Sequence, residues 1–279
     1  YASGLAPADW ALCRGLFPGT LPRGIGIDVS GTVEAVGEGV TDVAVGDHVL
    51  GSSDWAGGPT GGASDHAIMN RWILVPDGLD LALAATLPMA LDTAYWHLSA
   101  LGLDADKSIL VHGAGTTIGF TAVQIALARG MKVIATAGET YADQLRAIGA
   151  IVTTYGDGMV QRVIALNGGT VDLAIDTAPV GGVLPELIEI VGGDPKNVMT
   201  ISDFAAAAEL GVRSTIKDGP TERPDGLAEF AQLAAAGEFR IPIAGMYPLE
   251  DWRTALEISL GGNARGKLLL LPGATGTTA

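Results

Sequence analysis

The stretch VHGAGTTIG, residues 111–119, decides the fold, because it lies between a strand pattern and a helical pattern. The run SILVH at 108–112 predicts the strand that leads into it, and KVIAT at 132–136 predicts the next strand. Between them, apolar residues recur at helical spacing from about 118 to 129, and Gly130 ends the helix. This order is typical of a dinucleotide-binding unit, in which N–H groups at the helix N-terminus hold a pyrophosphate.

The glycines of this loop, Gly113, Gly115 and Gly119, depart from the usual G-x-G-x-x-G spacing. Threonine at 116 or 117 keeps the backbone further from a phosphate but adds a hydroxyl donor, so we expect the loop to bind phosphate. A tight strand-to-helix turn without a ligand would use glycine in the same way, and this alternative stays open. The flanking strands and helix favour cofactor binding.

The tip of the second strand, residues 136–138 (TAG), carries no carboxylate. NAD-dependent enzymes place Asp or Glu there to accept hydrogen bonds from the adenosine ribose. A neutral tip leaves room for a 2′-phosphate and removes the repulsion between like charges. We therefore expect NADP(H) as cofactor, with the alternative that Glu139 bends back onto the ribose of NAD.

The rest of the chain shows two kinds of pattern. Residues 1 to about 90 contain short β-like runs between Gly, Pro and Asp, which predict an all-β segment. From about 91, strands and helices alternate through VDLAID and VMTI, which predicts a parallel sheet covered by helices. From about 238 a strand, a helix and the closing strand GKLLLL follow. For a chain of 279 residues we expect two domains.

Composition excludes several classes of function. The formal net charge of −15 argues against nucleic acid or an anionic membrane as partner, because both repel an acidic surface. No uninterrupted apolar run is long enough to span a bilayer. The single cysteine, Cys13, excludes an intrachain disulfide and a cysteine-based zinc cluster, which favours the cytoplasm, and we expect it to be buried. Because the chain opens YASG without Met, we expect a trimmed chain.

The segment GIDVSGTVEAVGEGV, residues 26–40, resembles the signature G-H-E-x-x-G-x-x-x-x-x-G-x-x-V of the medium-chain dehydrogenase/reductase superfamily. Ile27 and Asp28 stand where zinc-dependent members have His and Glu. Ala6 stands at their metal-ligating Cys and Ala8 at their relay Ser/Thr. Because alanine and isoleucine supply no ligand, we expect no metal. Together with its glycine loop, the chain is similar to the zinc-free quinone oxidoreductase branch.

This resemblance implies an α/β fold of two domains. It predicts a GroES-like, mostly β catalytic domain from residues 1–92 and 238–279, without the strands that the family normally has before this point. It predicts a Rossmann nucleotide-binding domain, a doubly wound parallel sheet, at 93–237. The implied activity is NADPH-dependent hydride transfer, without metal, to a quinone or an α,β-unsaturated carbonyl compound. Relatives pair through sheet edges, so a homodimer is expected.

The resemblance also implies the residues of the site. The implied cofactor residues come from the pyrophosphate loop, the ribose position, a tyrosine beside the 2′-phosphate and the segments after the fourth and fifth strands. In that order they are Gly113, Ala114, Gly115, Thr116, Thr117, Ile118 and Gly119; Thr136 and Ala137; Tyr155; Thr177 and Ala178; and Ile201, Ser202 and Asp203. Thr93, which matches a threonine near the nicotinamide, and Tyr95 are the candidate catalytic donors to the developing oxyanion. Tyr155 and Thr93 could instead pack between the domains.

Two other functions stay open. Ala6 and Ala8 remove polar groups from the expected substrate side, which suggests a dinucleotide-binding sensor or scaffold without turnover. A zinc alcohol dehydrogenase is the third alternative and would require metal in the purified protein. Asp28 is expected to cap a backbone group or pair with a cation, and Lys267 is expected to reach either the cleft or solvent.

Overall fold

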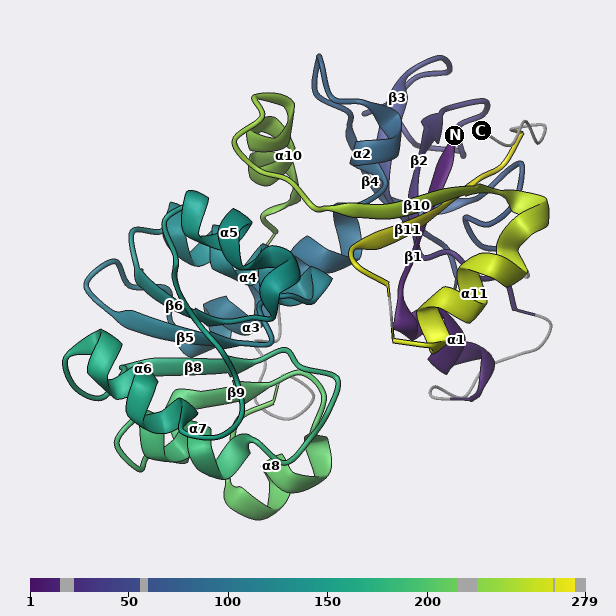
Figure 1. The fold of residues 1–279 in the computed structure, drawn as a ribbon. Helices are drawn as coiled ribbons and strands as arrows, with labels where there is room; N and C mark the ends of the chain where they lie inside the picture. Colours follow the sequence, from purple (N-terminus) through teal and green to yellow (C-terminus); the bar gives the residue numbers. More distant parts are fainter. Residues whose placement is uncertain (16–22, 56–59, 215–224, 263, 274–279) are drawn as a thin grey trace. The chain divides into compact units, whose positions relative to one another are not determined.

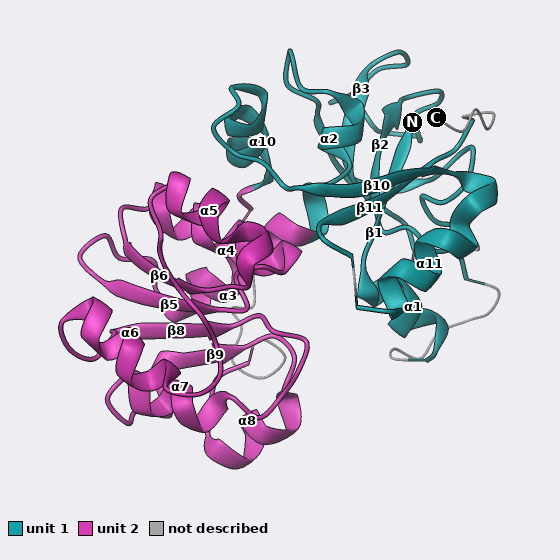
Figure 2. Ribbon diagram, in the orientation of Figure 1, with its two compact units in different colours: residues 1–89, 227–279 teal, residues 90–226 magenta. Residues whose placement is uncertain are grey.

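The computed structural model describes residues 1–15, 23–55, 60–214, 225–262 and 264–273. The chain forms two compact units (Figure 2): unit 1 is Tyr1–Met89 with Leu227–Ala279, and unit 2 is Ala90–Gly226. The boundaries predicted from the sequence, 92/93 and 237/238, lie further along the chain, and helix α10 (Leu227–Ala235) belongs to unit 1. Within the described residues, no helix is both long and apolar enough to cross a membrane.

Unit 2 is built on a parallel sheet whose described strands run in the order β7–β6–β5–β8–β9 (Figure 1). The strands are β5 (Ser108–His112), β6 (Lys132–Thr136), β7 (Ile151–Thr153), β8 (Leu173–Asp176) and β9 (Val198–Thr200). Both β5 and β8 are buried along their whole length, as expected for strands covered by helices on both faces. The strand order reverses between β5 and β8, and ligands of such sheets bind at this switch point, beyond the carboxyl ends.

Helices cover the two faces of this sheet, which confirms the predicted doubly wound fold. Helix α3 (Pro88–Leu101) precedes the first strand of this sheet. Helices α4 (Thr117–Ala128) and α5 (Glu139–Ala147) pack on one face of the sheet, and the rings of Phe120 on α4 and Tyr141 on α5 lie 5.6 Å apart. The opposite face, with Leu110 and Ile134 in its core, is covered by α6 (Met159–Asn167), α7 (Leu184–Ile190) and α8 (Phe204–Leu210). A 3-10 turn, η1 (Pro195–Asn197), leads into β9.

The sheet of unit 1 combines strands from both ends of the chain. Its described strands run in the order β10–β11–β1–β2–β3–β4. They are β1 (Ala2–Leu5), β2 (Asp28–Thr32), β3 (His48–Ser53), β4 (Met69–Leu74), β10 (Ile243–Pro248) and β11 (Lys267–Leu271). β1 pairs antiparallel with β11, with Ser3 opposite Leu270. A 3-10 turn, η2 (Leu249–Asp251), and α11 (Trp252–Leu260) connect β10 to β11.

Two short helices interrupt the front segment, so the prediction of an all-β segment was wrong there. They are α1 (Pro7–Cys13) and α2 (Leu81–Ala84), and carboxylates cap both. Asp9 Oδ2 accepts the N–H of Ala6 at 2.8 Å, and Asp80 Oδ1 accepts that of Ala82 at 2.8 Å. Helices of one or two turns repeat their apolar positions too few times to give a helical pattern, which is why the sequence pattern missed them. Cys13, expected to be buried, is exposed at the end of α1.

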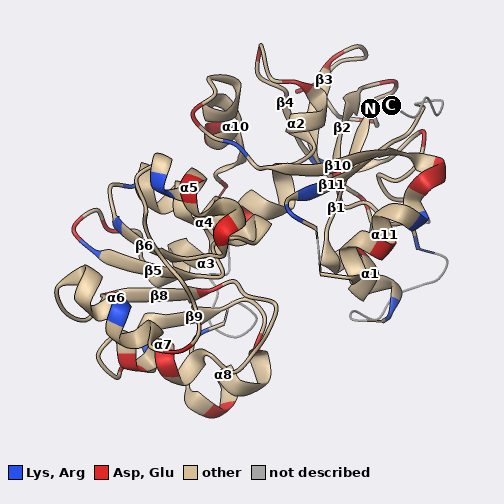
Figure 3. Ribbon diagram, viewed as in Figure 1, with Lys and Arg blue, Asp and Glu red and all other residues tan. Residues whose placement is uncertain are grey.

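Acidic side chains are spread over both units (Figure 3). Figure 3 shows them on α7 and α8 of unit 2 and on α11 of unit 1. The net charge of −15 is therefore a property of the whole chain and not of one tail or loop. A distributed negative charge keeps a protein soluble and repels polyanions along its surface.

Candidate functional site

The loop that follows β5 turns into α4 at the switch point of the sheet in unit 2. Gly113 has a φ of +75°, and a Cβ there would lie 2.7 Å from the backbone nitrogen of Ala178. A Cβ on Gly119 would lie 2.4 Å from the carbonyl oxygen of Gly113. Gly115 differs, because its Cβ would meet nothing closer than the ring of Tyr141 at 3.8 Å. Gly113 and Gly119 therefore allow close packing, whereas Gly115 leaves room for a ligand.

Thr116 caps α4 at the position where the usual fingerprint has glycine. Its φ of −77° and ψ of 160° are extended backbone that any residue adopts. Its Oγ1 accepts the N–H of Gly119 at 3.0 Å. Among the described residues, the N–H groups of Thr117 and Ile118 in the same turn have no protein partner. These two donors, at the positive end of a helix dipole, fit a pyrophosphate group.

At the tip of β6, the side chain of Thr136 points into the protein and not outward as the sequence predicted. Thr136, predicted at the adenosine ribose, is fully buried, and its Oγ1 accepts the N–H of Gly113 at 3.1 Å. Ala137 is also buried, so the exposed part of the tip begins at Gly138. The hydroxyl of Tyr155 lies 3.9 Å from where a Cβ on Gly138 would be, and its side chain is exposed. Tyr155 and Gly138 thus lie together at this edge.

Five polar residues end the five described strands of this sheet, and we call them the polar row. In spatial order they are Thr153, Thr136, His112, Asp176 and Thr200. Thr136 Oγ1 lies 2.9 Å from His112 Nδ1, and Thr200 Oγ1 donates to Asp176 Oδ2 at 2.9 Å. Burial raises the pKa of Asp176, and burial lowers the pKa of His112 against a smaller opposite effect of Glu186. Sequence reasoning singled out only Thr136, although a polar residue ending every strand was the available signal.

The segments after β8 and β9 join the loop at the same edge. Thr177 Oγ1 donates to the carbonyl oxygen of His112 at 2.7 Å. Ser202 Oγ donates to the carbonyl oxygen of Ala178 at 2.7 Å. Asp203 caps α8 and also accepts the N–H of Gly182 at 3.0 Å. The structure therefore brings the predicted cofactor residues from the ends of all five described strands to one side of unit 2, and Ile201 lies in the segment after β9.

The two predicted catalytic residues, Thr93 and Tyr95, lie on α3. Tyr95 is far from the start of α4. The hydroxyl of Tyr95 accepts a hydrogen bond from Arg129 at 3.0 Å, and Arg129 is the C-cap of α4. A helix of 12 residues is about 18 Å long, so Tyr95 is held near the far end of α4 from the loop. The carbonyl oxygen of Thr93 lies 2.7 Å from Nδ1 of His97.

In unit 1 the position of the zinc signature holds a buried ion pair. The described residues contain no group of three or more His, Cys, Asp or Glu that could hold a metal ion. Lys267 Nζ donates to Asp28 Oδ2 at 2.5 Å, and Met89 N–H donates to Asp28 Oδ1 at 2.8 Å. Burial raises the pKa of Asp28 to about 6, although Lys267 opposes this shift. Asp28 therefore pairs with a cation and caps a backbone group, while Lys267 is buried and not in solvent.

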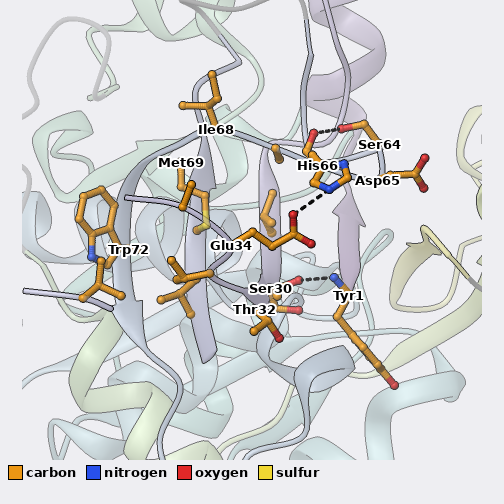
Figure 4. Close-up of a pocket in the computed structure, with 18 of the residues that line it drawn as sticks. Tyr1, Ser30, Thr32, Glu34, Ser64, Asp65, His66, Ile68, Met69 and Trp72 are labelled. Carbon is orange, nitrogen blue, oxygen red and sulfur yellow. Dashed lines mark hydrogen bonds and ion pairs between the residues drawn. The ribbon is translucent and has the colours of Figure 1, made fainter. Parts of the chain in front are cut away.

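A cavity of about 670 Å³ also lies in unit 1, beside strands β2, β3 and β4 (Figure 4). Its wall is largely aliphatic, with Met69 and Trp72 on one side. Among the lining residues, Glu34 Oε2 lies 2.8 Å from His66 Nε2, and both side chains are exposed. None of its described lining residues belongs to the predicted cofactor or catalytic residues, so the cavity is not part of the predicted site.

Two family descriptions match the chain. Residues 1–77 match an alcohol dehydrogenase GroES-like domain, and residues 148–270 match a zinc-binding dehydrogenase domain. Erythronolide synthase EryA2 of Saccharopolyspora erythraea is 32% identical over 96% of this chain, which spans only 8% of that protein. Human quinone oxidoreductase is 28% identical, with 97% of this chain and 87% of that protein aligned. A mycobacterial protein solved in complex with NADPH has a TM-score of 0.70 and 25% identity, covering 97% and 89% of the two chains.

The chain therefore belongs to the medium-chain dehydrogenase/reductase superfamily, a group of oxidoreductases that bind NAD(P)(H). Over both of its units the chain is similar to quinone oxidoreductases. The GroES-like and Rossmann domains that the sequence predicted are confirmed.

Proposed function

We propose that the chain is an NADPH-dependent reductase that transfers hydride to a quinone or an α,β-unsaturated carbonyl compound without a metal ion. The observation that carries this proposal is the loop after β5, where a Cβ on Gly115 would meet nothing closer than 3.8 Å and the N–H groups of Thr117 and Ile118 are available to a phosphate. The human relative named quinone oxidoreductase and the similar structure solved with NADPH support it.

Bound NADPH supplies a hydride from C4 of its nicotinamide to the electrophilic carbon of the acceptor. The residues of this chain bind the pyrophosphate, exclude water and hold the acceptor in near-attack geometry. The oxygen that gains negative charge takes a proton from a side-chain donor or from water, which completes a two-electron reduction. Thr93 stays the predicted donor, whereas the hydroxyl of Tyr95 is already bound by Arg129 and is left out of this role.

The proposed activity is tested with purified protein titrated with NADPH and NADH by intrinsic fluorescence. NADPH oxidation is then measured with benzoquinone, naphthoquinone and cyclohexenone as acceptors. We expect NADPH to bind more tightly than NADH and to be oxidised by at least one acceptor. Binding without turnover on any acceptor would favour a sensor or scaffold, and failure of both nucleotides to bind would overturn the proposal.

Tyr155 supports the choice of NADPH, because its exposed hydroxyl lies beside the neutral tip of β6. We expect Tyr155→Phe to weaken NADPH binding on the order of tenfold, since it removes one hydrogen bond to a charged phosphate. NADH, which lacks this phosphate, should bind the variant as it binds the wild type. Dissociation constants for both nucleotides check this, with Tyr247→Phe on β10 as the matched control. An equal loss for NADH and NADPH would show that Tyr155 does not contact the phosphate.

A further inference from the structure

A chain of two hydrogen bonds lies beneath the glycine loop of unit 2. The N–H of Gly113 donates to Thr136 Oγ1 at 3.1 Å, and the same oxygen lies 2.9 Å from His112 Nδ1. Thr136 is fully buried and His112 is 7% exposed, so water cannot readily replace either partner. The backbone carbonyl of Thr136 also accepts the N–H of Ala114 at 2.9 Å. Thr136 therefore binds the first two N–H groups of the loop, one through its side chain and one through its backbone.

The hydroxyl of Thr136 has one proton to donate and can accept from two donors. Burial lowers the pKa of His112, which favours the neutral ring. A neutral ring that carries its proton on Nε2 accepts the Thr136 proton at Nδ1, and this turns a lone pair of Oγ1 toward Gly113 N–H. Two carboxyl groups face this arrangement: Asp176 is the partner of His112 on the neighbouring strand, and Glu186 on α7 acts electrostatically on His112.

We propose that His112 and Thr136 are positioning residues for the pyrophosphate loop. His112 orients the hydroxyl of Thr136, and that hydroxyl fixes Gly113 in the conformation from which α4 begins. The proposal rests on the proposed function, because the loop is taken to hold NADPH. It assigns Thr136 a role under the loop in place of the contact with the adenosine ribose that the sequence resemblance implied. Neither side chain needs to touch the cofactor.

The first test compares Thr136→Val, which keeps the shape but removes the hydroxyl, with Thr136→Ser, which keeps the hydroxyl. We expect Thr136→Val to raise the Kd and KM for NADPH on the order of tenfold, because Gly113 N–H loses its partner. The kcat at saturating NADPH should stay close to the wild-type value, and Thr136→Ser should restore most of the affinity. Thr121→Val is the matched control, since Thr121 is also fully buried in unit 2 but donates to the carbonyl of Thr117 within α4.

The second test uses His112, which decides the result if Thr136→Val does not fold. His112→Asn places an amide near the position of Nδ1, whereas His112→Leu removes the polar group. We expect His112→Leu to weaken NADPH binding several-fold more than His112→Asn does. The comparison requires that the two variants have similar melting temperatures, so that a difference in affinity does not reflect unfolding. If Thr136→Val and His112→Leu bind NADPH as tightly as the wild type does, this inference is overturned while the proposed function stands. If the wild type does not bind NADPH, the proposed function is overturned and this inference with it.

Discussion

Replacement of Lys267 by Met is expected to lower the free energy of unfolding by about 3–5 kcal/mol, because it leaves the buried carboxylate of Asp28 without its cation. Both side chains are almost completely buried, at 3% and 1% exposure, so water cannot take the place of the lost ammonium group. Urea unfolding followed by circular dichroism measures the change. Asp28→Asn combined with Lys267→Met removes both charges, and this double variant should regain most of the lost stability.

The pH dependence of Lys267→Met gives a second check with a defined sign. Burial already raises the pKa of Asp28 from 3.8 to about 6 in the folded protein. A carboxyl whose folded pKa is raised binds its proton more tightly when folded, so its contribution to stability is lost as pH rises through that window. Without Lys267 the folded pKa rises further, and the variant should be more destabilised at about pH 8 than at about pH 5. A destabilisation independent of pH would mean that packing, not charge, causes it.

Gly119→Ala is expected to abolish NADPH binding and to destabilise the protein by about 3 kcal/mol, the upper range for overpacking. The added Cβ would lie 2.4 Å from the carbonyl oxygen of Gly113 and 2.6 Å from Thr177 Oγ1, so the loop has to move away from β8. Thermal unfolding and fluorescence titration with NADPH measure the two effects.

Gly115→Ala is the matched comparison for stability, because its Cβ meets no atom closer than 3.8 Å. We expect its melting temperature to equal that of the wild type, while its Cβ hinders the approach of a phosphate and weakens NADPH binding. Equal melting temperatures for Gly115→Ala and Gly119→Ala would contradict the packing of the loop described above.

Local patterns in the sequence predicted the elements around the cofactor edge. Strands 108–112 and 132–136 begin and end where the apolar runs predicted, and α4 begins one residue early because Thr116 caps it. Both strands are buried in a parallel sheet, and such strands are visible as short continuous apolar runs. The short helices α1 and α2 were missed, since each depends on a single capping carboxylate and not on a repeating pattern.

Interactions between distant parts of the chain could not be predicted in the same way. Asp28 and Lys267 are separated by 239 positions, and only the pairing of the strands brings them together. The inward direction of Thr136 depends on the register between β5 and β6, which places it next to His112. A side-chain period of two fixes the face of a residue only after the register is known. The sequence therefore predicts which residues lie at the edge, but not which of them face the ligand.

The pairing of β1 with β11 delays the completion of the sheet in unit 1 during synthesis. Ser3 on β1 pairs with Leu270 on β11, so β1 is made long before its partner strand. Unit 2 is one continuous segment, Ala90–Gly226, and it lies between the two strands in the sequence. Unit 2 can therefore fold while the β11 side of β1 still has no partner strand. An unpaired strand edge is prone to aggregation, so slow translation between β1 and β11 should reduce the yield of this protein through unit 1.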